Sequence, residues 1–298
     1  MNIEAYLESK KKIVEEALFK YLPAPGTFPA VIHEAMHYSL AAGGKRLRPI
    51  LVLAAAEAVG RCDPEVLAPL FCAVEYIHTY SLIHDDLPAM DDDDFRRGKP
   101  SCHKAFGEGI AILAGDALLT YAFEVLTYLA PPRGVFPEPL VVQIIQDISH
   151  NIGTAGLIGG QVVDLQSEAA PVDLPSLEYI HRHKTGALFK TCILSGARLA
   201  GATERELEQL SLYADAFGMA FQIVDDILDV EGDPALLGKP VGSDAKKQKA
   251  TYPGLVGITA ARKRAEDCIT AAVQALEPFG EKAEALRQLA IFIGQRKA

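Results

Sequence analysis

No part of the 298-residue sequence reads as a membrane-spanning segment or a secretory signal. The most apolar stretch, GIAILAGDALLTYAFEVLTYLA, is interrupted by Asp116 and Glu124, whereas a spanning helix needs about 20 predominantly apolar residues. The N-terminal segment MNIEAYLESKKKIVEEAL is charged and amphipathic and lacks the apolar core of a signal peptide. These absences predict a cytoplasmic protein without a membrane span.

Cysteine pairing motifs and an excess of positive charge are missing as well. The five cysteines, at positions 62, 72, 102, 192 and 268, include no CxxC pair, which fits reduced thiols rather than a disulfide framework or a zinc site. The formal net charge is −10, the wrong sign for a protein that binds nucleic acid. We therefore expect no nucleic-acid partner.

Alternation of apolar and polar residues, the pattern of β-strands, is scarce. Apolar residues instead recur every three or four positions, as in FCAVEYIHTYSLIHDD and LYADAFGMAFQIVDDILDV, which is the period of amphipathic helices. Segments such as PAPGTFP and PPRGVFPEP separate the helical stretches, and none is long or polar enough for an interdomain linker. The sequence predicts one all-α domain, residues 1–298, built of about ten or more helices.

A crowding of aspartates in HDDLPAMDDDDFRRG, residues 84–98, is the first feature that needs a chemical explanation. Six aspartates fall within ten residues, although like charges this close repel unless a cation or water separates them. His78 and Asp85, seven residues apart, share one face of the preceding helical stretch. Pro88 cannot lie inside a regular helix, so we expect a kink that returns Asp91 to the face of Asp85.

A second aspartate cluster lies in a predicted helix over residues 212–230. Apolar residues cover most of its circumference, which predicts a buried helix. One polar stripe crosses it: Asp215, Gln222, Asp225, Asp226 and Asp229. Buried carboxylates need a cation or hydrogen-bond donors, and two such clusters in a helical protein fit Mg²⁺ best. For residues 91–94 taken alone, a solvated acidic surface is an equal alternative.

Basic residues accompany these clusters. Mg²⁺ held by carboxylates keeps positions open for phosphate oxygens, and arginine and lysine bind phosphate directly. The candidates lie in GGKRLRP, RRG and HKTG and further along the chain: Lys45, Arg46, Arg48, Arg96, Arg97, Lys184, Thr185, Lys239 and Lys249. GGKR lacks the spacing of a P-loop, and GTAGLIGG does not match GxGxxG.

The ordered set DDLPAMDDDD, DDILD, GGKRLRP, RRG, HKTG and GQVVDL closely resembles the trans-isoprenyl diphosphate synthases, and the bacterial farnesyl diphosphate synthases most of all. The likeness extends from about Gly43 to Tyr252. It implies a helical bundle around a central substrate cavity, with the two aspartate motifs facing each other across its mouth, and a homodimer. It also implies condensation of isopentenyl diphosphate with dimethylallyl or geranyl diphosphate, through an allylic carbocation, to farnesyl diphosphate (C15).

The resemblance assigns metal ligands and catalytic residues. Three Mg²⁺ ions would be held by Asp85, Asp91 and Asp225, which Asp86, Asp226 and Asp229 would support or join. The direct partners of the allylic diphosphate would be Arg96, Lys184, Lys239 and Lys249. Thr185 and Gln222 would line the reacting carbons. The residues expected to carry the catalysis are Asp85, Asp225, Lys184, Thr185 and Gln222.

The resemblance also assigns the second substrate pocket and the pocket floor. Isopentenyl diphosphate would bind Lys45, Arg48, His78 and Arg97. Gln161 and Asp164 match a further cavity motif. Tyr80 and Ser81 precede Asp85 by five and four residues, and a bulky side chain at the fifth position would limit the length of the growing chain.

Other functions stay open from the residues alone. A geranylgeranyl diphosphate (C20) synthase shares nearly every motif. A helical metal phosphohydrolase of the H…HD…D type would use His78, His84 and Asp85, but it would not need the second aspartate stripe. A terpene cyclase would not need GGKRLRP, and a metal-binding scaffold leaves the buried carboxylates without a purpose.

Overall fold

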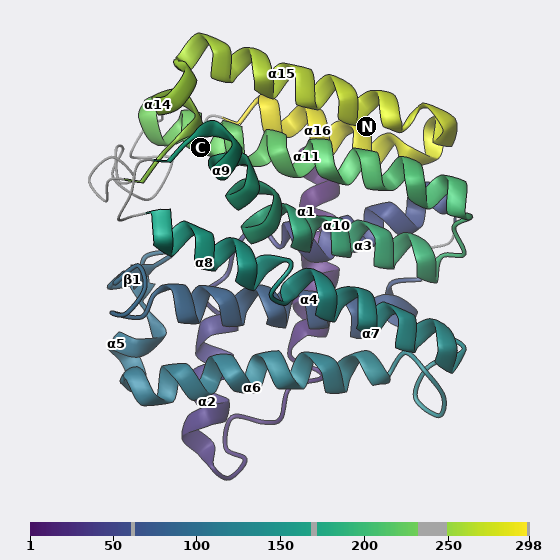
Figure 1. Ribbon diagram of the computed structural model, residues 1–298. Helices are drawn as coiled ribbons and strands as arrows, with labels where there is room; N and C mark the ends of the chain where they lie inside the picture. Colours follow the sequence, from purple (N-terminus) through teal and green to yellow (C-terminus); the bar gives the residue numbers. More distant parts are fainter. Residues whose placement is uncertain (61–62, 168–171, 232–248, 297–298) are drawn as a thin grey trace. The chain divides into compact units, whose positions relative to one another are not determined.

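The computed structural model describes residues 1–60, 63–167, 172–231 and 249–296 (Figure 1). Within them the predicted all-α fold is confirmed, since the described strands are only β1 (Phe95–Arg96) and β2 (Lys99–Pro100), which pair antiparallel. The chain divides into two compact units, which are described separately. Unit 1 consists of Met1–Tyr6, Ala54–Cys62 and Gln146–Ala298, and unit 2 of Leu7–Leu53 and Asp63–Ile145.

Unit 2 is arranged around α4. Its helices are α1 (Ile3–Leu18), α2 (Ala30–Leu40), α3 (Leu47–Val59), α4 (Pro64–Asp85), α5 (Cys102–Phe106), α6 (Glu108–Thr127) and α7 (Glu138–Ile152). Of these, α1, α3 and α7 extend into the residues of unit 1. The start of α4 is fixed by Asp63, whose side chain accepts a hydrogen bond from the Glu65 amide, and by proline at the first helical position. Apolar residues all around α4 bury it against α6 and α2.

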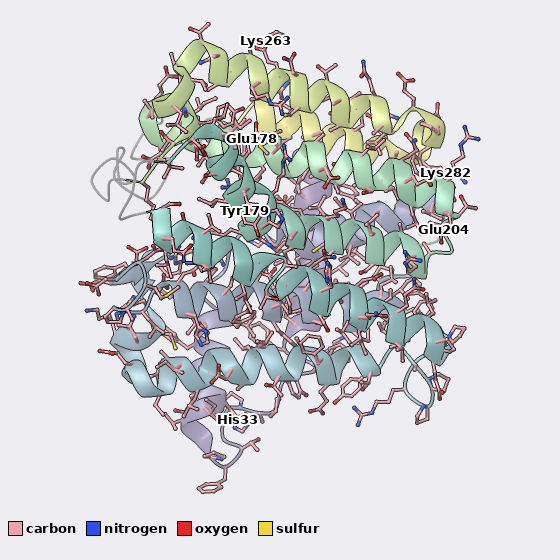
Figure 2. The ribbon with its side chains drawn as sticks, in the orientation of Figure 1. His33, Glu178, Tyr179, Glu204, Lys263 and Lys282 are labelled. Carbon is pink, nitrogen blue, oxygen red and sulfur yellow. The ribbon has the colours of Figure 1, made fainter. Side chains whose placement is uncertain are left out.

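Unit 1 is arranged around α11. Its helical segments are α8 (Leu157–Ser167), α9 (Leu174–Ile180), the π-helical η1 (His181–Gly186), α10 (Ala187–Leu199), α11 (Glu204–Glu231), α14 (Tyr252–Val256), α15 (Ile258–Ala275), the 3₁₀-helical η2 (Glu277–Ala283) and α16 (Glu284–Gly294). α11 packs against α15, α10, η1 and α16. Lys263, by contrast, lies on the face of α15 turned away from α11, where its side chain is largely exposed (Figure 2).

The buried-helix prediction for residues 212–230 is correct for most of α11 and wrong at two apolar positions. Phe217, Ile223 and Leu228 are buried, whereas the side chains of Leu212 and Val230 are 58% and 49% exposed. The neighbouring described elements therefore do not cover the whole circumference of α11.

Among the helices that the structure describes, α4 and α6 are long and apolar enough to cross a membrane by length and composition. Core helices satisfy the same criterion, and α4 and α6 pack against each other within unit 2. The absence of a membrane span therefore stays a prediction.

Candidate functional site

The first aspartate motif begins where α4 ends. The amide of Asp91 donates a hydrogen bond of 2.8 Å to the carbonyl oxygen of Asp85, and the amide of Asp92 donates one of 3.1 Å to that of Leu87. The chain around Pro88 thus turns back onto the end of the helix, as its sequence led us to expect. Asp85 and Asp91 are both half-buried there.

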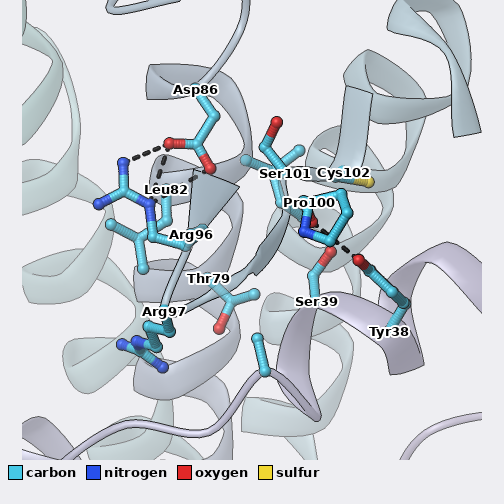
Figure 3. A pocket seen from close by; sticks show the side chains of 12 residues that line it. Tyr38, Ser39, Thr79, Leu82, Asp86, Arg96, Arg97, Pro100, Ser101 and Cys102 are labelled. Atoms are coloured by element: carbon cyan, nitrogen blue, oxygen red, sulfur yellow. Dashed lines mark hydrogen bonds and ion pairs between the residues drawn. The ribbon is translucent and has the colours of Figure 1, made fainter. Parts of the chain in front are cut away.

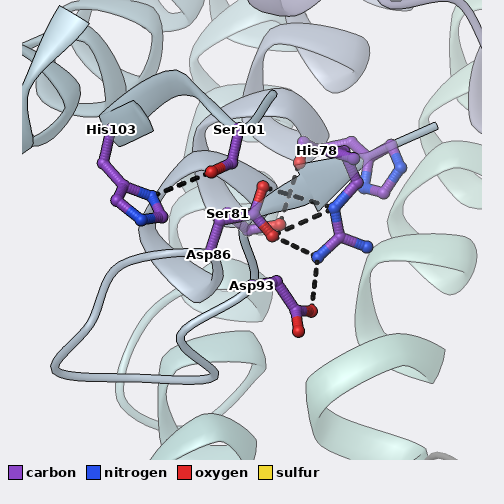
Figure 4. Close-up of polar contacts among 7 residues, drawn as sticks. His78, Ser81, Asp86, Asp93, Ser101 and His103 are labelled. Carbon is purple, nitrogen blue, oxygen red and sulfur yellow. Dashed lines mark hydrogen bonds and ion pairs between the residues drawn. The ribbon is translucent and has the colours of Figure 1, made fainter. Parts of the chain in front are cut away.

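Asp86, the next residue after α4, is only 2% exposed, and its carboxylate accepts hydrogen bonds from an arginine. Arg96 donates from Nε at 3.0 Å and also from Nη2 to the Asp86 carboxylate, and Nη2 lies 3.4 Å from an oxygen of Asp93 (Figure 4). Burial raises the pKa of Asp86, and the hydrogen bond from Arg96 opposes that shift. The contact fixes the Arg96 guanidinium beside the motif.

A small pocket of about 30 Å³ opens beside this contact (Figure 3). Its charged lining consists of Asp86, Arg96 and Arg97, and Thr79 contributes a hydroxyl. Two guanidinium groups at one pocket provide donors for an anion.

GGKRLRP is held in place by a buried ion pair. Arg46, 4% exposed, donates from Nη1 to Glu75 Oε1 at 2.8 Å and from Nη2 to the carbonyl of Leu40 at 2.7 Å. Glu75 is 2% exposed. Arg46 is therefore an internal anchor, and its neighbours Lys45, which is exposed, and Arg48, which is half-buried, are the residues left near the surface.

Gly44 of the same motif allows Arg97 to approach the backbone. The φ of Gly44 is +130°, and a Cβ atom there would lie 2.3 Å from Nη1 of Arg97. Any other residue would strain the chain and displace the guanidinium. The motif and Arg97, predicted to bind one substrate together, are thus in contact.

His78 completes this group through Arg48. Arg48 Nη1 lies 3.2 Å from His78 Nε2, and because a guanidinium only donates, the imidazole accepts and is neutral. Burial, with Arg48 and Arg97 nearby, holds the pKa of His78 well below its ordinary value.

This lowered pKa has a consequence for stability. Unfolded His78 binds a proton near its ordinary pKa of about 6.5 while the folded form resists it, so acid favours unfolding. We expect His78 to cost up to about 1.4 kcal/mol of stability per pH unit below pH 6.5. Urea unfolding of wild type and His78→Gln at pH 7.5, 6.5 and 5.5 measures this difference, and an equal pH dependence of the two proteins would contradict it.

Tyr80 and Ser81 lie one to two turns before the end of α4. Tyr80 is 5% exposed, its hydroxyl is buried without a hydrogen-bond partner, and its ring meets the His84 ring edge-on at 5.8 Å. Burial raises the pKa of Tyr80 to about 12. The Ser81 hydroxyl instead donates to the carbonyl of His78 at 2.9 Å, within its own helix.

His84 faces α6 rather than a metal site. Its Nε2 donates to the carbonyl oxygen of Ile112 at 3.0 Å, and α6 comes so close that a Cβ at Gly115 would lie 2.1 Å from the same nitrogen. A carbonyl only accepts, so this nitrogen carries a proton. The same nitrogen lies 3.8 Å from Asp116 Oδ1, and because its proton is donated to a backbone carbonyl it offers no lone pair to a metal, which does not suit the HD phosphohydrolase alternative.

The second aspartate motif, in unit 1, divides into buried and half-buried carboxylates. Asp226 and Asp229 are 9% and 2% exposed, and Asp225 is half-buried, 3.7 Å from Arg296. Asp226 Oδ2 accepts a hydrogen bond of 2.7 Å from the amide of Tyr252 and lies 3.4 Å from His181 Nε2. Asp226 therefore links α11 to α14 and η1.

Not every polar residue of the stripe is part of this group. Asp215 is exposed and pairs with Lys190 at 2.8 Å. Gln222 is half-buried and lies one turn before Asp225 and Asp226 and two turns before Asp229.

The HKTG motif lies in the π-helical turn η1. Such turns are rare and are frequent at functional sites. Lys184 Nζ donates to Asp164 Oδ2 at 2.6 Å, and Lys249 Nζ lies 3.9 Å from the same oxygen. A Cβ at Gly160 would lie 2.2 Å from the Lys184 amide nitrogen, so α8 passes η1 at a distance that only glycine permits. The ammonium groups of Lys184 and Lys249 therefore share the single carboxylate of Asp164.

The predicted site residues fall into two sets. Unit 2 holds Lys45, Arg48, His78, Tyr80, Ser81, Asp85, Asp86, Asp91, Arg96 and Arg97, and unit 1 holds Gln161, Asp164, Lys184, Thr185, Gln222, Asp225, Asp226, Asp229 and Lys249. Lys239 lies outside the described residues. The individual roles assigned to these residues stay predictions.

Sequence reasoning missed the buried partners of the site. It did not pair Arg46 with Glu75, and it gave no role to His181, although HRHKTG places that histidine directly before the motif. Pairing across 29 residues, as in Arg46 and Glu75, leaves no local pattern in one sequence.

Comparison with known proteins identifies the family of the chain. Residues 29–289 match the polyprenyl synthetase family. Over 296 residues the chain is 47% identical to the geranylgeranyl diphosphate synthase of Cyanophora paradoxa, covering 99% of this chain and 97% of that protein. It is 45% identical to the farnesyl diphosphate synthase of Geobacillus stearothermophilus, covering 99% and 98%.

A solved structure gives the same assignment. The geranylgeranyl pyrophosphate synthetase of Pyrococcus horikoshii superposes with a TM-score of 0.88 at 33% identity, covering 99% of this chain and 100% of that one. The chain belongs to the polyprenyl synthetase family and is a prenyltransferase.

Proposed function

We propose that this prenyltransferase condenses isopentenyl diphosphate with dimethylallyl and then geranyl diphosphate to give farnesyl diphosphate (C15). The observation that carries the proposal is that each unit combines a carboxylate set with cations. In unit 2 the guanidinium of Arg96 donates to the carboxylate of Asp86, and in unit 1 the ammonium groups of Lys184 and Lys249 both lie at the carboxylate of Asp164. Carboxylates for a metal and cations for an anion are the two requirements of a diphosphate substrate.

The proposed metal ligands suit Mg²⁺. The donors are carboxylate oxygens alone, the ligands that this ion prefers. We assign three ions to Asp85, Asp91 and Asp225, with Asp86, Asp226 and Asp229 supporting or joining them. Bound Mg²⁺ would supply positive charge that stabilises the departing diphosphate.

The basic residues bind and orient the two diphosphates in this proposal. Arg96, Lys184, Lys239 and Lys249 hold the allylic diphosphate. Arg96 is already fixed by Asp86, so little reorganisation is needed when the C–O bond breaks. Isopentenyl diphosphate binds Lys45, Arg48, His78 and Arg97, and neutral His78 adds a polar contact without a further charge.

The carbocation is protected by groups that do not trap it. The Thr185 hydroxyl and the Gln222 amide stabilise it electrostatically. The isopentenyl double bond attacks the allylic carbon, and the released diphosphate accepts the proton that is lost. No side-chain general base is required.

Tyr80 sets the product length in this proposal. Its ring is buried and its hydroxyl has no partner, so the side chain acts through its volume. We expect Tyr80→Ala to shift the products from C15 to C20 or longer, as read by chromatography of the dephosphorylated products. The matched control, Tyr80→Phe, keeps the ring, and its products should still end at C15. If Tyr80→Ala also gives only C15 products, Tyr80 does not limit the chain length.

One incubation tests the function. The purified chain is supplied with Mg²⁺, dimethylallyl diphosphate and isopentenyl diphosphate, and the products are separated by length. A C15 product supports the proposal. Inorganic phosphate without a longer prenyl product would favour the phosphohydrolase, and omission of Mg²⁺ should abolish elongation.

A C20 synthase is the second candidate. It is favoured by the 47% identity to a protein named geranylgeranyl diphosphate synthase, beside 45% to one named farnesyl diphosphate synthase. A C20 end product in the same incubation would replace the C15 proposal and leave the site assignments unchanged.

The remaining proposals concern the state of the protein. We propose a cytoplasmic homodimer of one-domain chains that does not bind nucleic acid, in keeping with the net charge of −10. Light scattering coupled to gel filtration should give twice the chain mass of 32.1 kDa.

A further inference from the structure

Among the described residues, one group of side chains that can bind a metal lies outside the set assigned above. Asp92 and Asp94, in the loop after α4, and His103, in α5, each place a ligand atom within 4.8 Å of the other two. All three residues belong to unit 2. Both aspartates are exposed, so an ion from solution can reach their carboxylates.

His103 is the feature that distinguishes this group from an ordinary acidic surface. His103 is only 6% exposed, and its Nε2 atom is buried without a hydrogen-bond partner. Its Nδ1 lies 3.0 Å from the Ser101 hydroxyl (Figure 4). In the tautomer in which Nδ1 donates to Ser101, Nε2 keeps a lone pair, the form in which histidine binds a metal.

The backbone holds the two ends of the group together. The amide of Ser101 donates to the carbonyl of Asp94 at 2.9 Å, next to the short β1–β2 pairing. His103 is thereby kept beside the loop that carries the aspartates. Lys104 Nζ lies 2.7 Å from Asp94 Oδ1 and balances one of the two negative charges.

We propose that Asp92, Asp94 and His103 bind one divalent transition-metal ion through His103 Nε2 and one oxygen of each carboxylate. A nitrogen with two carboxylates suits Zn²⁺ or Co²⁺ and does not suit Mg²⁺, which prefers oxygen ligands alone. The site shares no ligand with the proposed Mg²⁺ set. The bound ion joins the loop after α4 to the start of α5.

Calorimetric titration of the full chain with Zn²⁺ tests the site. An excess of Mg²⁺ is present throughout, so that sites made of oxygen ligands alone are filled. Asp92→Asn/Asp94→Asn should weaken Zn²⁺ binding by about tenfold or more. Both residues are exposed, so circular dichroism should show an unchanged fold. The matched control, Glu108→Gln, removes a nearby exposed carboxylate and should retain wild-type affinity.

A third variant moves the affinity the other way. Lys104→Gln removes the cation that competes for Asp94, so Zn²⁺ should bind severalfold more tightly. Weaker or equal binding in this variant would count against Asp94 as a ligand.

Crystals soaked in Zn²⁺ supply a direct readout through anomalous scattering. A peak in contact with His103 Nε2 supports the site. Equal Zn²⁺ affinity in wild type and Asp92→Asn/Asp94→Asn, or a peak confined to other residues, would overturn it. None of these measurements uses prenyl transfer, so they do not depend on the proposed function.

Discussion

Replacing Glu75 with glutamine should lower the free energy of unfolding by about 3–5 kcal/mol. Glu75 and Arg46 are 2% and 4% exposed, and their side chains meet at 2.8 Å. The amide keeps the shape of the carboxylate but removes its charge, which leaves the buried guanidinium with no buried counter-charge. Urea unfolding of both proteins at one pH gives the difference directly.

Two further variants separate the buried pair from ordinary surface electrostatics. Glu15 also contacts Arg46, at 3.7 Å, but its side chain is 40% exposed, so Glu15→Gln should cost less than about 1 kcal/mol. Arg46→Met/Glu75→Leu removes both charges and should recover stability relative to Glu75→Gln. If Glu75→Gln and Glu15→Gln have the same free energy of unfolding, the buried ion pair of Arg46 and Glu75 does not stabilise the fold as we infer.

Replacing Asp225 with asparagine should lower kcat on the order of 10²–10³-fold. Asparagine keeps the size and one oxygen of the side chain but removes the negative charge proposed to bind Mg²⁺, so less positive charge would be held where the diphosphate departs. Steady-state rates at saturating substrate, measured over a range of Mg²⁺ concentrations, give this effect. The variant should also need more Mg²⁺ for half-maximal activity.

Asp215 provides the matched control on the same helix. It is exposed and pairs with Lys190 at 2.8 Å, so Asp215→Asn removes one charge from α11 outside the proposed site. Its kcat should stay within about twofold of wild type because an exposed pair contributes little. A similar loss in both variants would show that any charge removed from α11 has this effect.

Short-range patterns in the sequence were sufficient for the helices and for the first aspartate motif. The apolar period predicted the helix that ends in this motif, and Pro88 predicted a kink, which the structure shows as the turn that brings the Asp91 amide to the Asp85 carbonyl. The same reasoning failed at Leu212 and Val230, which are exposed on α11. Periodicity shows which residues share a helix face, but it does not show which neighbours cover that face.

The candidate site was predictable as a set of residue types and not as a set of contacts. Motifs named Arg96 and Asp86 separately, yet the bond between them depends on the loop of residues 87–95, which turns back at the end of α4 and brings residues ten positions apart together. The sharing of Asp164 by Lys184 and Lys249 joins residues from α8, η1 and the chain before α14. Such contacts are made by packing, which a single sequence does not record.

The sequence by itself determined that the chain is helical and that it carries two aspartate motifs with basic residues beside them. Helical period and motif spacing are local properties, so reading along the chain was enough to find them. Only the tertiary structure decided which charges are internal supports, such as Arg46 on Glu75, and which stay half-buried, such as Asp225. The physical reason is that burial and counter-charges depend on elements distant in the chain, and these set the energy of every ionised group.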